Sequence, residues 1–81
     1  MILKLTVHAQ VRLQERGFSI DALKKVIREP DEQKQLEGGL IRVVKNLGHN
    51  VLLRVIYKRD GFRSKKEEYI IITAYFVDSQ K

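Results

Sequence analysis

The hydrophobic pattern changes its period at Pro30, and this change constrains the fold more than any other feature of the sequence. Before Pro30, apolar residues recur at the spacing of helices; from Asp31 onward they alternate, which is the two-residue period of strands. Proline also disfavours helical geometry in the residue before it, so the helical part ends there. The sequence therefore predicts an α+β domain with its helices first and its strands after.

Two helices are predicted before the change of period. The segment 6–17, "TVHAQVRLQERG", has Thr6 as its N-cap and Gly17 as the residue that ends it. The segment 19–30, "SIDALKKVIREP", has Ser19 as its N-cap. The apolar residues of the second helix share one face: Ile20, Leu23, Val26 and Ile27.

Four strands are predicted after Pro30, as an antiparallel meander. "EQKQLEGGLIRVVKNL" indicates two strands joined at Gly38–Gly39, "LGHNV" a second tight turn, and "VLLRVIYKR" and "EYIIITAYFV" two further strands. A three-residue loop at "GHN" pairs Val44 with Arg54 and places Arg42 and Arg54 on one face. A short strand at "ILKL" is a further option. We expect both helices to cover one face of this four-stranded antiparallel sheet and to leave the other face for a partner or a working cleft.

Size and composition predict a single domain over residues 1–81. Hydrophobic residues make up 43% of the chain and charged residues 32%, which is typical of folded globular proteins. The absence of cysteine excludes disulfides and thiolate metal sites, and it fits a cytoplasmic protein. The apolar runs are as short as strands, so we expect no transmembrane helix and no membrane partner.

The charge balance favours a polyanionic partner. Sixteen basic residues against ten acidic ones give a formal net charge of +6, and neutralising nucleic-acid phosphates releases condensed counterions. We expect no metal site, because His8 and His49 fall on different elements and no acidic residue completes a ligand spacing. No phosphate-binding glycine loop is present either, so no cofactor is expected.

His8, Arg12 and Arg16 form a row on the first predicted helix, beside a narrow apolar stripe of Ala9 and Leu13. Histidine is the side chain best suited to proton transfer near neutral pH. Cleavage of RNA by its own 2′-hydroxyl requires a base, an acid and positive charge at the phosphate, and it requires no metal. The row can supply much of that set. Charged rows on helices are common, however, so spacing alone favours a solvated helix edge.

The last predicted strand carries hydroxyl groups. Strict alternation places Ile70, Ile72, Ala74 and Phe76 against the helices and Tyr69, Ile71, Thr73 and Tyr75 on the open face. A tyrosine there can donate a proton or stack on a base, although half-buried tyrosines are also common in strands with no such role.

Basic residues interrupt or follow the other strands. Arg42 and Arg54, in apolar surroundings, indicate contacts to phosphate or carboxylate, or equally protection of a sheet edge. The segment 58–66, "KRDGFRSKK", contains Lys58 and Arg63 around Phe62. It suits a nucleic-acid-binding arm, and it equally suits an exposed hairpin.

"HAQVRLQERGFS", written H-A-x2-R-x3-R-G, with a second helix that ends at Pro30 and a last strand containing "TAYF", resembles a small prokaryotic family of domains of unknown function. That family is thought to belong with the barnase–EndoU–colicin–RelE group of metal-independent ribonucleases, many of which are toxins of toxin–antitoxin pairs. The resemblance implies a RelE/barnase-like fold and an RNase-like site. Its motif falls on His8, Arg12 and Arg16, and it ends on Thr73 and Tyr75.

We therefore expect a metal-independent endoribonuclease, the toxin of a toxin–antitoxin pair, with RNA and an acidic antitoxin as partners. The predicted catalytic residues are His8, Arg12 and Tyr75. The predicted substrate contacts are Arg16, Arg42, Arg54, Lys58, Arg63 and Thr73. Two alternatives remain: a non-catalytic nucleic-acid-binding module on the same basic face, and a protein-interaction domain whose open face binds an acidic peptide.

Overall fold

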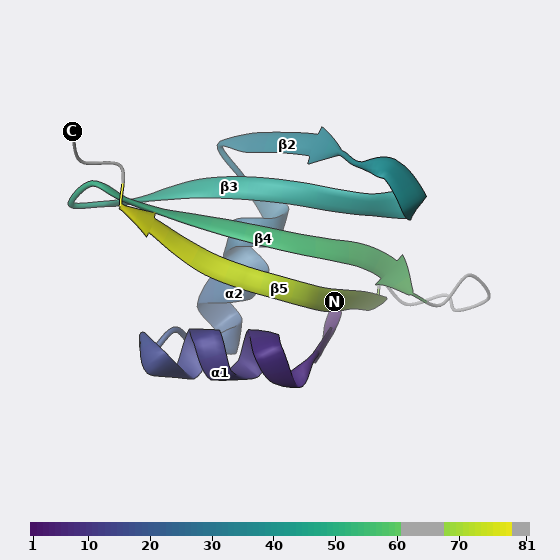
Figure 1. The fold of residues 1–81 in the computed structure, drawn as a ribbon, viewed down its shortest axis with the longest axis horizontal. Helices are drawn as coiled ribbons and strands as arrows, with labels where there is room; N and C mark the ends of the chain where they lie inside the picture. Colours follow the sequence, from purple (N-terminus) through teal and green to yellow (C-terminus); the bar gives the residue numbers. More distant parts are fainter. Residues whose placement is uncertain (61–67, 79–81) are drawn as a thin grey trace.

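Seven regular elements make up the part of the chain that the computed structural model describes, residues 1–60 and 68–78 (Figure 1). In chain order they are β1 (Ile2–Leu5), α1 (Val7–Glu15), α2 (Ile20–Arg28), β2 (Glu32–Gln35), β3 (Leu40–Gly48), β4 (Val51–Asp60) and β5 (Glu68–Asp78), with a short 3₁₀ turn at Glu37–Gly39 between β2 and β3. Within these residues, no helix has the length and apolar character needed to cross a bilayer.

The sheet has five strands in the order β1-β5-β4-β3-β2 and is mixed, so the predicted four-stranded antiparallel sheet is wrong. Strands β2 to β5 do form an antiparallel meander, but β1 pairs in parallel with the beginning of β5. The four residues of β1 are too few for a clear period, and a parallel partner at the other end of the chain leaves no turn signal between the two strands. The domain remains α+β.

Side-chain caps begin both helices at the predicted residues. The hydroxyl of Thr6 accepts a hydrogen bond from the backbone N–H of Ala9 at 3.2 Å, and that of Ser19 accepts one from Ala22 at 3.1 Å. After α1, Gly17 adopts a φ of 63°, a left-handed geometry that glycine allows at little cost. The local signals for both helices are thereby confirmed.

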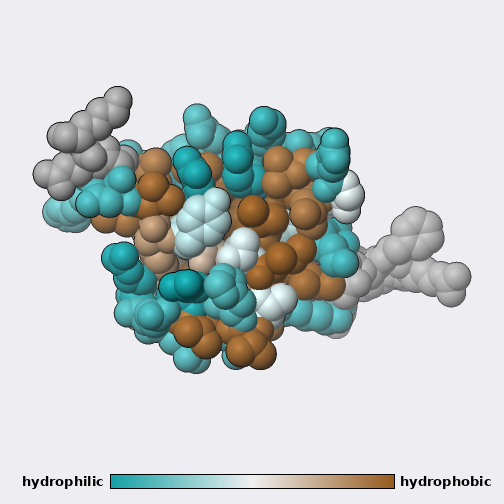
Figure 2. All heavy atoms as spheres, in the orientation of Figure 1, coloured by the Kyte–Doolittle hydropathy of each residue, from teal (hydrophilic) through white to brown (hydrophobic). Residues whose placement is uncertain are grey.

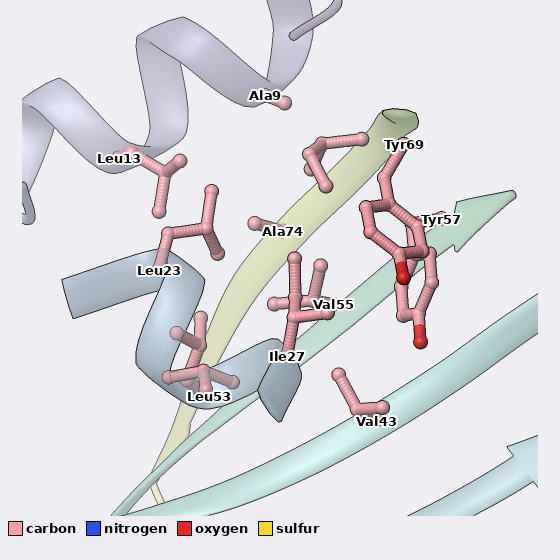
Figure 3. Close-up of a cluster of buried hydrophobic side chains, with 12 residues drawn as sticks. Ala9, Leu13, Leu23, Ile27, Val43, Leu53, Val55, Tyr57, Tyr69 and Ala74 are labelled. Carbon is pink, nitrogen blue, oxygen red and sulfur yellow. The ribbon is translucent and has the colours of Figure 1, made fainter. Parts of the chain in front are cut away.

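One hydrophobic core lies between the helices and one face of the sheet (Figure 3). Leu23 of α2 is fully buried, together with side chains from three strands: Val43, Leu53, Val55 and Ile71. α1 contributes only Ala9 and Leu13, in agreement with its narrow stripe. In Figure 1, α2 crosses behind the sheet, whereas α1 runs along the side of β5. Among residues 1–60 and 68–78, no helix covers the opposite face of the sheet.

A β-bulge in β5 changes which side chains enter the core. Thr73 pairs with Ile56 of β4, but the next pair joins Ile71 to Tyr57, so Ile72 has no partner on that strand. Because the extra residue reverses the alternation, Ile71 is buried under the helices rather than exposed on the open face.

The face prediction for the first half of β5 is therefore wrong. Tyr69 is buried in the core, with its ring edge-to-face against Tyr57 at a centroid distance of 5.3 Å. Burial raises the pKa of the Tyr57 hydroxyl. Beyond the bulge the prediction is confirmed, because Ala74 and Phe76 contribute to the core and Thr73 and Tyr75 face away from it.

The turn between β3 and β4 is tighter than predicted. His49 and Asn50 both have positive φ, 54° and 63°, which defines a two-residue type I′ turn rather than a three-residue loop. The register between β3 and β4 shifts by one residue at Leu47, which has no partner on β4. Val44 therefore still pairs with Arg54 as predicted.

The side chain of Asp31, the residue before β2, links the start of that strand to β3 through two contacts. Its carboxylate accepts a hydrogen bond from the backbone N–H of Asn46 at 2.7 Å and lies 3.6 Å from the ammonium of Lys45. The N–H of Asn46 first, and the charge of Lys45 in addition, lower the pKa of Asp31 from its ordinary value. A carboxyl group with a lowered folded-state pKa stabilises the fold above its unfolded-state pKa, and this contribution is lost as the pH falls through the folded-state pKa.

We predict that Asp31→Asn lowers the melting temperature at neutral pH and that the difference from wild type shrinks as the pH falls toward about 2. The amide oxygen of the variant can still accept the hydrogen bond from Asn46, so the fall in melting temperature measures the contribution of the negative charge. Thermal unfolding followed by circular dichroism across this pH range measures it. Glu37→Gln, the same loss of charge in the β2–β3 connection, is the control; a difference for Asp31→Asn that is independent of pH contradicts the prediction.

Candidate functional site

α1 occupies the part of the β5 edge that β1 leaves free. β1 pairs only with residues 68–71, after which the chain turns at Thr6 and continues as α1 beside the rest of β5. The backbone N–H of Thr6 donates to the carbonyl oxygen of Ile71 at 3.1 Å, and its hydroxyl donates to that of Ile72 at 2.7 Å. The same residue therefore caps the helix and attaches it to the strand at the bulge.

A cleft of about 210 Å³ lies between α1 and β5, and we call it the rim cleft. Its lining residues are Arg12, Glu15 and Arg16 of the helix and Tyr75 and Phe76 of the strand. The Arg12 guanidinium lies 3.8 Å from the Glu15 carboxylate, and that of Arg16 lies 5.0 Å from the centroid of the Phe76 ring. The structure thus brings two residues of the predicted helical row together with the "TAYF" strand.

His8 does not line the rim cleft. It is exposed on α1, one helical turn before Arg12 and so about 6 Å away along the helix axis. The structure places it at the helix end that Thr6 attaches to the bulge, beside the cleft rather than within it. Its predicted role as acid or base stays a prediction.

Arg54 lies on the other side of Tyr75. The two residues are direct cross-strand partners on the open face, so Tyr75 stands between an arginine of β4 and the arginines of α1. Arg54 is half-buried, and its Nε is buried without an acceptor among the described residues. A buried donor without a partner costs about 1–3 kcal/mol, and a bound anion would offset that cost.

The remaining predicted contacts spread over the open face. Figure 2 shows apolar residues gathered over the middle of this face, with hydrophilic ones around them. Thr73 and Arg42 are both paired with Ile56, on opposite sides of β4, and Lys58 is exposed further along the same strand. Arg63 and most of the basic segment lie outside the described residues.

Glu15 is a residue of the site that the sequence analysis missed. Its signal was present, because residues three apart on a helix are neighbours and Arg12 lies three positions earlier. The carboxylate offsets part of the positive charge of the rim cleft. Among residues 1–60 and 68–78, no three histidine or acidic side chains are grouped so as to hold a metal ion.

We predict that Thr6→Val destabilises the protein by about 1–2 kcal/mol, because it removes both a helix cap and the bond from the hydroxyl to Ile72. Thr6→Ser keeps the hydroxyl and is the matched control, expected to stay within about 0.5 kcal/mol of wild type. Urea unfolding measures both. Equal stabilities of Thr6→Val and Thr6→Ser would show that the Thr6 hydroxyl contributes nothing to stability.

Comparison with known proteins identifies a family without a described activity. A family model described as a domain of unknown function (DUF4258) matches residues 5–76, a span that contains α1 and the "TAYF" segment of β5. The expected resemblance to a family of domains of unknown function is confirmed at this level. No curated protein and no solved structure shows significant similarity to the chain.

Proposed function

The chain belongs to the DUF4258 family, and from that premise we propose that it is a metal-independent endoribonuclease. The observation that carries the proposal is the position of Tyr75, between the unpartnered guanidinium Nε of Arg54 and the arginines of the rim cleft. The further placement with the barnase–EndoU–colicin–RelE ribonucleases is part of the proposal and is supported by the sequence resemblance described above.

Three guanidinium groups around one phenol suit a phosphodiester. Arginine presents a planar set of donors that matches the oxygens of a phosphate, and it stays charged at any physiological pH. Arg54 approaches from the open face, whereas Arg12 and Arg16 approach from the helix. A phosphate seated over Tyr75 would therefore be held from two sides, with Thr73 available to donate a further hydrogen bond from the same face.

The proposed reaction uses the 2′-hydroxyl of the RNA. Its oxygen attacks the neighbouring phosphorus, the bond from phosphorus to the 5′-oxygen breaks, and a cyclic phosphate and a free 5′-hydroxyl result. His8 takes the proton of the 2′-hydroxyl and the phenol of Tyr75 gives a proton to the departing oxygen; exchange with water restores both groups. The arginines stabilise the negative charge that builds up on the phosphate oxygens, which is the largest single effect in many such sites.

The biological role that we propose is that of a toxin with an acidic antitoxin as its partner. The sequence resemblance supports this role, and so does the open face, which Arg42, Arg54 and Lys58 share. A face with these basic residues and with apolar residues over its middle (Figure 2) complements an acidic peptide. One observation favours the non-catalytic alternative, a nucleic-acid-binding module: His8, the predicted base, lies outside the rim cleft.

We predict that the purified protein cleaves single-stranded RNA in the presence of EDTA. Arg54→Gln is expected to reduce the rate about 100- to 1,000-fold, because it removes a group that stabilises the transition state. Tyr75→Phe is expected to reduce it about 100- to 10,000-fold, as the loss of a proton donor. In the same assay, His8→Ala tests whether His8 takes the proton of the 2′-hydroxyl. Product analysis checks for cyclic phosphate ends.

Lys25→Gln, the loss of one exposed positive charge on α2, is the matched control for these variants. Cleavage at the wild-type rate in both Arg54→Gln and Tyr75→Phe would contradict the site. Binding of RNA that weakens with salt, without any product, would instead establish the non-catalytic module.

A further inference from the structure

A second, more apolar hollow lies directly beside the rim cleft. It has a volume of about 260 Å³ and lies at the end of the molecule where α1 ends and the β3–β4 turn begins, on the left in Figure 1. Its walls include Phe18, Leu47, His49 and Val51. Arg16 and Phe76 line both this hollow and the rim cleft, so the two cavities share one wall.

The shared wall is built from stacked groups. The rings of Phe18 and Phe76 meet edge-to-face at a centroid distance of 5.7 Å, and the guanidinium of Arg16 lies over the Phe76 ring. The backbone N–H of Phe18 donates to the carbonyl of Leu13 at 2.9 Å, which fixes the loop to the end of α1. The wall is therefore held by contacts within the protein.

The geometry points to this hollow as a binding subsite for one nucleobase of RNA, next to the phosphate in the rim cleft. This inference rests on the proposed function for the occupant of the cleft. An occupant of both cavities must carry an anionic group and, beside it, a flat group that accepts an apolar aromatic environment, and a nucleotide has this form. Arg16 lies where the two parts of the nucleotide would join, and His49 can hydrogen-bond the edge of the base.

The fold around the hollow explains why these side chains are available. Leu47 is the extra residue beside the β3–β4 turn, and 37% of its surface is exposed although it is a large apolar side chain. His49, which has positive φ in the type I′ turn, also lines the hollow. Both features arise from the turn and its bulge, and neither residue contributes to the hydrophobic core of the domain.

The test compares a DNA hexamer with an abasic hexamer of the same length, both of which lack the 2′-hydroxyl and so cannot be cleaved. We expect the wild-type protein to bind the hexamer with bases about tenfold or more tightly, since one stacked base has an effect of that order. Leu47→Gln and Phe18→Leu are expected to remove most of this preference and to leave binding of the abasic hexamer unchanged. Val7→Gln, the same kind of change at an exposed apolar position of α1, is the control.

Fluorescence anisotropy gives the affinities, and thermal unfolding verifies that each variant is folded. Phe18 packs against Phe76, so Phe18→Leu also removes a packing contact of the folded protein. If that variant does not fold, the result for Leu47→Gln alone tests the subsite. Equal binding of the two hexamers by the wild type, or an unchanged preference in Leu47→Gln, overturns the subsite. The preference for bases without cleavage of RNA in EDTA would support the subsite and refute the ribonuclease, so the two proposals fail separately.

Discussion

The attachment of Thr6 to the bulge of β5 is the interaction on which the rest of the site depends. One hydroxyl accepts the bond that caps α1 and donates to the carbonyl of Ile72, the residue without a partner on β4. A bulge interrupts the regular ladder of a sheet, and here the helix uses a backbone group of the interrupted strand. The direction of α1 along β5 follows from this junction, and with it the position of Arg12 and Arg16 beside Tyr75.

The arrangement of charge around Tyr75 has a cost in stability that a purely structural role does not explain. A half-buried arginine in an apolar strand, with its Nε unpaired, destabilises the protein relative to an apolar residue of similar size. Protection of a sheet edge is not the reason, because Arg54 lies on β4, which is paired on both sides. The anion site that we propose would give this Nε a partner.

Local signals made much of the fold predictable from sequence. The caps at Thr6 and Ser19 and the pairing of Val44 with Arg54 depend on a few neighbouring residues or on one tight turn, and the structure confirms them. The parallel pairing of β1 depends on a contact between the two ends of the chain, for which a single sequence holds no signal.

The bulge in β5 is a second feature that could not be predicted from the sequence, and it affects the residues near the site. Strict alternation cannot reveal an inserted residue, so Ile71 was assigned to the wrong face while Thr73 and Tyr75 were assigned correctly. The sequence analysis groups Arg12 with Tyr75 among the predicted catalytic residues, and both line the rim cleft. The position of His8 outside the rim cleft cannot be read from the sequence, because it depends on where along β5 the helix is attached.

We propose that arginines of the sheet and of α1 contact the same nucleic-acid backbone. The salt dependence of binding tests this contact, because each phosphate contact with a single strand contributes about 0.7 to the slope of log affinity against log salt concentration. For a single-stranded DNA hexamer, Arg54→Gln and Arg12→Gln are each expected to make this slope less steep by about 0.7 relative to wild type, and the double variant by about 1.4. An unchanged slope in both single variants would show that these arginines do not meet phosphate and would contradict the account.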